Sequence, residues 1–143
     1  MSSYQRILCA VDLGADSHVV VARAVAMGSQ FQATLRLIHV VELMPIEPMS
    51  DSLLPMVQID DRVMQLATAQ LHELAAAAGV GADQVQVISG NVKNEVLKQA
   101  RDWHADLIVL GGRERHGLSI AINLTEDTVL HGAPCDLLAV RLR

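Results

Sequence analysis

Residues 6–14, RILCAVDLG, are the stretch of sequence that decides the fold. Ile7 to Val11 are all apolar, and Asp12 and Gly14 then supply residues typical of a turn. A short apolar run that ends in a turn is typical of a strand that is buried on both faces. The sequence therefore predicts a central strand of a parallel sheet at the start of the chain.

Four further segments have the composition of strands, at residues 34–41, 84–89, 106–110 and 137–142. Polar and apolar residues alternate in QVQVIS, residues 84–89, which predicts a strand near an edge of the sheet. DLIVL, residues 106–110, is the most strongly apolar of the segments and is predicted to be interior.

Apolar residues at helical spacing predict a helix after each of the first four strands. The expected helices run from Asp16 or Ser17 to about Gln30, from Asp60 or Asp61 to about Ala78, from the cap Asn91 to Trp103, and from about Ser119 to His131. The expected inner faces are Val19, Ala22, Arg23 and Ala26 in the first helix, Val63, Ala67, Leu71, Leu74 and Ala78 in the second, and Val92, Val96, Ala100 and Trp103 in the third.

The remaining segments are expected to be connections. Glu42 to Val57 contains three prolines and is predicted to form a long loop, which in a compact domain is usually functional or mobile. Gly111 to Gly117 is predicted to form a glycine-bounded loop. The alternation of strands and helices predicts one α/β domain over residues 1–143, with right-handed crossovers and a doubly wound parallel sheet. Ligands of this architecture bind where the strand order reverses.

Composition excludes several classes of function. The net charge is −5, which disfavours binding to nucleic acid or to an anionic membrane surface. No apolar run approaches the roughly 20 residues of a membrane helix, and residues 1–6 are polar. Cys9 and Cys135 lack a disulfide or metal spacing and are expected to be buried free thiols. We therefore expect a cytoplasmic protein without membrane insertion.

Several segments in order resemble the universal stress protein family. They are ILCAVDL at 7–13, LIHVV at 37–41, Gly90, ADLIVLGG at 105–112, HGLS at 116–119 and HGAPCDLLAV at 131–140. Each motif alone is weak, but the ordered set spans almost the whole chain. Together with the alternation of elements, the resemblance implies an adenine-nucleotide alpha-hydrolase-like sheet of five strands in the order 3-2-1-4-5.

The nucleotide motif of that family is incomplete in this chain. The family motif is G-x-x-G, nine residues, then G-[S/T], and its glycines let backbone N–H groups approach phosphates. Gly111 fits the first position, but the second falls on Glu114 and the third on Leu124, followed by Thr125. If the chain has a one-residue deletion relative to the family, the final G-[S/T] positions of the motif fall on Asn123 and Leu124 instead. The chain thus resembles the subclass that does not hold ATP tightly.

If a nucleotide does bind, the resemblance implies its contacts. These would be Asp12, Val40, Gly111, Gly112, Arg113, Gly117 and Thr125, with Asp12 at the ribose and metal. Asp12 can equally cap its own turn. Arg113, Arg115 and His116 could hold an anion through their side chains or form a solvated loop. His39 is expected to be structural, and the other histidines form no metal pattern.

The sequence contains no G-x-S-x-G, P-loop or G-x-G-x-x-G motif, so no enzyme activity is expected. We expect a stress-response module without a cofactor that works through contacts with unidentified proteins; the alternative is an AMP- or ATP-binding module with regulation or very slow hydrolysis. A flavin domain is disfavoured because only three aromatic residues are present.

The last strand is expected to form a homodimer. It is apolar and comes last in the strand order, so it should present unpaired backbone groups at the sheet edge. Relatives that this chain resembles pair these strands antiparallel, which would set Asp136 near Arg141 of a second copy. The expected interface residues are Leu137, Leu138, Ala139, Val140 and Arg141. The alternative is that a helix or the 42–57 loop covers this edge.

We predict weak or absent ATP binding, because Glu114 would set a carboxylate beside the phosphates and two of three motif glycines are missing. Calorimetry with Mg²⁺-ATP measures this, and a micromolar dissociation constant would contradict it. The double substitution Glu114→Gly with Leu124→Gly should leave the affinity unchanged or raise it.

Overall fold

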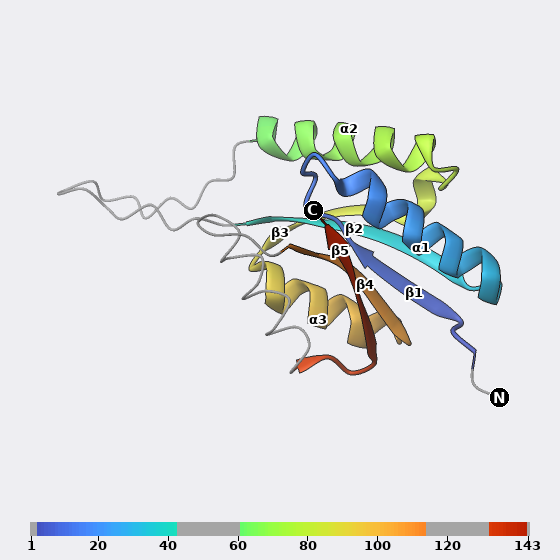
Figure 1. Ribbon diagram of the computed structural model, residues 1–143. Coiled ribbons are helices and arrows are strands. Elements are labelled where there is room, and N and C mark those ends of the chain that lie inside the picture. Colours follow the sequence, from blue (N-terminus) through green and yellow to red (C-terminus); the bar gives the residue numbers. More distant parts are fainter. Residues whose placement is uncertain (1–2, 43–60, 114–131, 143) are drawn as a thin grey trace.

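A computed structural model describes residues 3–42, 61–113 and 132–142 (Figure 1). Strands and helices alternate along the chain as the sequence predicts. The elements are β1 (Arg6–Ala10), α1 (Ser17–Phe31), β2 (Thr34–Glu42), α2 (Asp61–Ala77), a 3-10 turn (Ala82–Gln84), β3 (Val85–Gly90), α3 (Val92–Trp103), β4 (Leu107–Arg113) and β5 (Asp136–Leu142).

The five strands form one parallel sheet in the order β3-β2-β1-β4-β5, which confirms the predicted order. Ile7 of β1 is in register with Leu35 of β2 on one side and with Leu107 of β4 on the other. The strand at 85–90 lies at an edge and the strand at 107–113 lies inside the sheet, both as predicted. The chain direction across the sheet reverses at β1.

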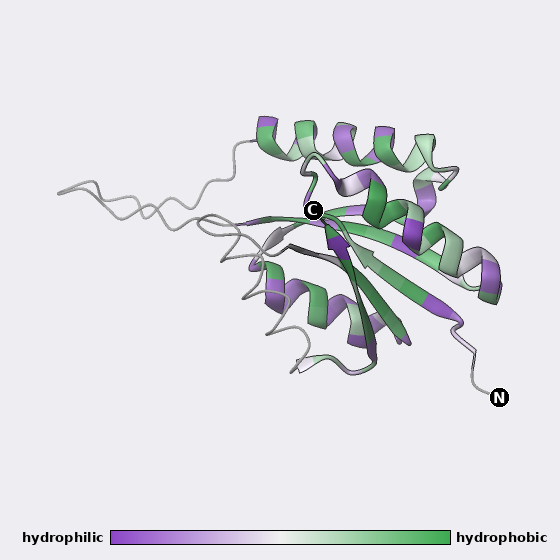
Figure 2. Ribbon diagram, in the orientation of Figure 1, coloured by the Kyte–Doolittle hydropathy of each residue, from purple (hydrophilic) through white to green (hydrophobic). Residues whose placement is uncertain are grey.

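Helices cover both faces of the sheet. Figure 1 shows α1 and α2 on one face and α3 on the other. Ile7 and Cys9 of β1 pack in the core beneath α1 and α2, whereas Leu8 packs in the core beneath α3. All three side chains are fully buried, so β1 is apolar on both faces, as its continuous apolar run predicted. In Figure 2 most of β1 has the colour of hydrophobic residues.

The predicted inner face of α1 is wrong. Val19 is 37% exposed, and Ala22, Arg23 and Ala26 are exposed as well. Three consecutive valines at 19–21 fit more than one helical phase, so periodicity alone could not select the buried face. The buried residues are Ser17, Val20, Val21, Ala24 and Gly28.

The predicted stripe of α2 is correct except at its start. Ala67 and Leu71 are buried, and Leu74 and Ala78 are partly buried against the same core. Val63 was predicted to be buried but is 48% exposed. The first turn of α2 lies beside a pocket and not against the sheet, which explains the difference.

Helix α3 has the predicted face and the predicted cap. Val96 and Ala100 are buried, and Val92 and Trp103 pack partly buried against the same core. The Asn91 side chain accepts the backbone N–H of Asn94 at 3.0 Å, which satisfies one donor of the first turn. Across the described ranges, no helix combines the length and apolarity of a membrane span.

Strand β4 is longer than predicted. Gly111, Gly112 and Arg113 belong to the strand and not to a loop, because they continue the ladder with residues 140–142 of β5. A Cβ at Gly111 would lie 2.8 Å from Cδ1 of Leu142 and 3.1 Å from Cγ2 of Val20, so any larger residue here would have to shift these two side chains. The rest of the predicted 111–117 loop, the 119–131 helix and most of the 42–57 loop lie outside the described residues.

We predict opposite effects for two glycine substitutions. Gly111→Ala should lower the free energy of unfolding by about 1–3 kcal/mol, because the new methyl group displaces Leu142 and Val20. Gly28→Ala should raise it by about 0.5–1 kcal/mol, since alanine stabilises a helix interior and its Cβ would meet no atom nearer than 3.8 Å. Urea unfolding of both variants measures the difference, and equal values would contradict the packing account.

Candidate functional site

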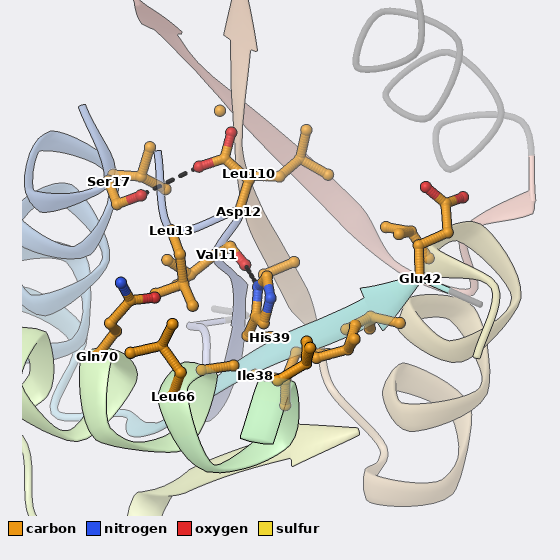
Figure 3. A pocket seen from close by; sticks show the side chains of 18 of the residues that line it. Val11, Asp12, Leu13, Ser17, Ile38, His39, Glu42, Leu66, Gln70 and Leu110 are labelled. Carbon is orange, nitrogen blue, oxygen red and sulfur yellow. Dashed lines mark hydrogen bonds between the residues drawn. The ribbon is translucent and has the colours of Figure 1, made fainter. Parts of the chain in front are cut away.

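A pocket of about 490 Å³ opens at the carboxyl ends of β1, β2 and β4 (Figure 3). It lies beside the point where the strand order reverses, which is where doubly wound sheets bind ligands. Its size is within the usual range for small-molecule sites. Asp12, Val40 and Gly111 of the predicted nucleotide set line it. Gly112 and Arg113 follow Gly111 in β4 and are not among the described lining, and Gly117 and Thr125 lie outside the described residues.

Asp12 is held in the turn that follows β1. Its Oδ1 accepts the backbone N–H of Gly14 at 2.8 Å and the hydroxyl of Ser17 at 3.0 Å. Ser17 is 4% exposed, so this hydrogen bond anchors the turn to the core. These contacts agree with the turn-capping role. Both contacts use Oδ1, and no residue in the described ranges forms a hydrogen bond with Oδ2.

Leu13 adopts the left-handed conformation, with φ of 61°. This region disfavours a residue with a side chain by roughly 1 kcal/mol or more. The Asp12–Ser17 contacts hold the backbone in this conformation, and the Leu13 side chain lines the pocket (Figure 3). The turn therefore fixes an apolar side chain at the site.

His39 of β2 is tied to the end of β1. Its Nδ1 lies 2.6 Å from the carbonyl oxygen of Val11. Because a carbonyl only accepts, Nδ1 carries the hydrogen and donates it. The half-buried ring thereby has the structural role expected from sequence, and it also lines the pocket. In the neutral ring, Nε2 is an acceptor within a mostly apolar wall.

Helix α2 supplies the outer wall of the pocket. Val63 and Leu66 line it and are 48% and 61% exposed, which is unusual for large apolar side chains of one helix end. Gln70 lies one turn further along the same helix (Figure 3). The sequence analysis did not identify these residues as site residues. The one sequence feature that could have indicated this wall is Leu66, a large apolar residue that lies outside the predicted buried stripe of the helix.

Strand β5 lies at the edge of the sheet opposite β3. Leu137 and Leu138 are half-buried and Ala139 is exposed, whereas Val140 is buried in the core. Asp136 accepts the Tyr4 hydroxyl at 2.8 Å, so the start of the strand is tied to the N-terminal segment. The described part of the chain places no strand beyond β5 in the sheet.

Both cysteine thiols are held in the protonated form. Burial raises the pKa of the fully buried Cys9 to about 12. Burial also raises the pKa of Cys135 to about 11, with further contributions from the carboxylates of Asp106 and Asp136. A thiol attacks as the thiolate, so neither group is activated as a nucleophile at neutral pH. Within the described ranges, no cluster of three or more His, Cys, Asp or Glu residues could hold a metal ion.

Comparisons with known proteins agree on one family. A family model described as the universal stress protein family matches residues 3–141. The curated universal stress protein A homolog 2 of Coxiella burnetii is 33% identical over 144 residues, which cover 100% of this chain and 99% of that protein.

Two solved structures share the fold. The universal stress protein UspA of Lactobacillus plantarum has a TM-score of 0.71 at 21% identity, covering 99% of this chain and 100% of the other. A universal stress protein in complex with cAMP has a TM-score of 0.66 at 18% identity, covering 97% and 98%.

We predict slow alkylation of both thiols in the native protein. At pH 7.5 the thiolate fraction of Cys135 should be roughly a hundredfold below that of an unperturbed cysteine, because its pKa rises from 9.0 to about 11. Its reaction rate with iodoacetamide should keep rising up to about pH 11. Cys9 should react only after unfolding, since it is fully buried. Mass spectrometry of each labelled peptide measures both rates, and labelling of native Cys9 at neutral pH would contradict the prediction.

Proposed function

Because the chain belongs to the universal stress protein family, we propose that it acts as a cytoplasmic homodimeric module of the stress response. It works through contacts with other proteins and not as an enzyme. Strand β5 carries this proposal. A strand at a sheet edge presents a row of N–H and C=O groups that can pair with a second chain.

The side chains of β5 support pairing with a second copy. Its middle is apolar, no proline interrupts it, and its charged residues Asp136 and Arg141 stand near its ends. Natural edge strands that avoid association usually carry a charge or a proline in the middle. In an antiparallel pair about a twofold axis, the Asp136 end of one strand meets the Arg141 end of the other. Charge complementarity therefore favours the antiparallel arrangement.

The contacts of the reactive side chains support a role without catalysis. The raised pKa of Cys135 keeps its thiol protonated. Asp12 forms a hydrogen bond within the turn after β1, and His39 forms one with the end of β1. Either side chain would have to break its hydrogen bond to act as a general base through the same atom. No cofactor and no nucleic-acid partner is proposed, the latter because the net charge is −5.

A second candidate function is the binding of an adenine nucleotide such as AMP or ATP. The observation that favours it is the pocket beside the strand reversal, lined by Asp12, Val40 and Gly111. A relative of the same fold has been solved in complex with cAMP. In this candidate, the nucleotide regulates the module or is hydrolysed very slowly.

We predict that the wild-type chain sediments at twice its mass of 15.4 kDa at micromolar concentration. Ala139→Pro removes a backbone donor from β5, and Ala139→Lys places like charges close together across the twofold axis. Both should shift the protein to the monomer, with circular dichroism confirming that each variant folds.

Gln86→Lys is the matched control, because Gln86 is an exposed residue of the opposite edge strand β3. This variant should remain dimeric. A wild-type monomer at micromolar concentration would refute the dimer. Folded Ala139 variants that remain dimeric would show that another surface holds it.

A further inference from the structure

We propose that Arg6, Arg36 and Trp103 form a recognition surface for an acidic peptide segment of a partner protein. This surface lies near the amino ends of β1 and β2, at the opposite end of the sheet from the pocket. The proposal rests on the proposed role in protein contacts and deepens it, because it names a surface other than β5 and the chemistry of the partner that fits it.

Strand geometry brings both arginines to the face of the sheet that α3 covers. Leu8 of β1 and Ile38 of β2 are buried in the core beneath α3. Arg6 and Arg36 each precede one of these residues by two positions, and residues two apart on a strand share a face. Arg36 is in register with Leu8, so the two arginines lie on neighbouring strands. Both reach the last residue of α3, Trp103.

Trp103 holds both guanidinium groups in place. Nη1 of Arg6 donates to the carbonyl oxygen of Trp103 at 3.2 Å, which satisfies one of the free carbonyl groups at the end of α3. The central carbon of the Arg36 guanidinium lies 4.5 Å from the centre of the indole ring, which is a cation–π contact. Side chains that are fixed before binding lose less conformational entropy when a partner binds. The recognition surface is therefore partly preorganised.

The three side chains offer hydrogen-bond donors that lack acceptors. Within the described ranges, neither guanidinium group pairs with a carboxylate, and the indole N–H has no hydrogen-bond acceptor. The carboxylate of Asp106 is already engaged, since it accepts the backbone N–H groups of Gln5 and Arg6 at 2.8 and 3.0 Å. A guanidinium group carries five N–H donors and no acceptor, so most of the donors of this surface remain available to a partner.

A carboxylate-rich peptide matches these donors. An arginine binds the two oxygens of a carboxylate through a pair of parallel hydrogen bonds. Arginine and tryptophan are also enriched among the residues that contribute most to protein–protein binding. Arg36 and Trp103 are half-buried, so part of each side chain remains accessible to a partner. A nucleic acid requires an extended basic surface, which a net charge of −5 disfavours, whereas a short acidic segment requires only these two cations.

Titration of the full chain with hexaglutamate, followed by tryptophan fluorescence, tests the proposal. Trp103 is the single tryptophan of the chain, so its emission reports on this surface directly. We expect a saturable change in emission with hexaglutamate and no change with hexaglutamine, which has the same length and no charge. The affinity for hexaglutamate should fall as salt is added, because salt screens exposed charges.

Arg36→Gln and Arg6→Gln should each raise the dissociation constant for hexaglutamate at least about tenfold, a difference of about 1.4 kcal/mol. Arg36→Lys keeps the charge but not the paired donors, so it should also bind more weakly than the wild type. Arg23→Gln is the matched control, because Arg23 is an exposed arginine of α1, on the other face of the sheet. It removes the same charge and should leave the dissociation constant unchanged. Circular dichroism confirms that each variant folds.

Three results would overturn the proposal. Emission that does not change with hexaglutamate at millimolar concentration excludes the recognition surface. Inorganic phosphate or a single-stranded oligonucleotide that binds as tightly as hexaglutamate excludes an acidic peptide as the intended partner. Equal weakening by Arg23→Gln and Arg36→Gln excludes the assigned residues. The dimer proposed for β5 is tested by sedimentation alone, so its failure and the failure of this surface are distinguishable.

Discussion

Strand β1 is enclosed on all four sides. β2 and β4 pair with its two edges, and the helices pack on its two faces. Ile7, Leu8 and Cys9 are fully buried as a result. Because both edges of β1 are paired, the chain first adds β2 and β3 on one side of β1 and then crosses to add β4 and β5 on the other side. The crevice at the end of β1 follows from that reversal.

Two aspartates secure the strand at opposite ends. Before it, the Asp106 carboxylate accepts the N–H groups of Gln5 and Arg6 at 2.8 and 3.0 Å, which ties the start of β4 to the start of β1. After it, Asp12 shapes the turn into α1. The pocket therefore lies against a fixed backbone, with Leu13 in a conformation that the turn imposes. A preformed pocket loses less entropy when a ligand binds.

The sequence predicted the features that depend on local pattern. Continuous apolar runs identified β1 and β4, alternation identified the edge strand β3, and Asn91 identified the start of α3. The strand order needed the family resemblance as well, because alternation of elements alone permits several orders. The interior of the fold was thus largely predictable.

The failures share a physical reason. The face of α1 depends on which of Val19, Val20 and Val21 meets the sheet, and that is a tertiary contact. The length of β4 depends on its pairing with β5 through Gly111, which local turn chemistry could not indicate. The wall formed by Val63 and Leu66 depends on where α2 lies relative to the pocket. Each failure concerns the geometry between elements and not the elements themselves.

The proposal that β5 pairs with a second copy of the chain is the central claim, and hydrogen exchange measured at two protein concentrations tests it most directly. Backbone N–H groups on the outer edge of β5 should exchange slowly at micromolar concentration and faster after dilution to low nanomolar concentration, because dilution removes the partner strand. The amides of β3, at the opposite edge, should be unaffected. Exchange in residues 136–142 that does not change with concentration, or a change confined to β3, would contradict the account.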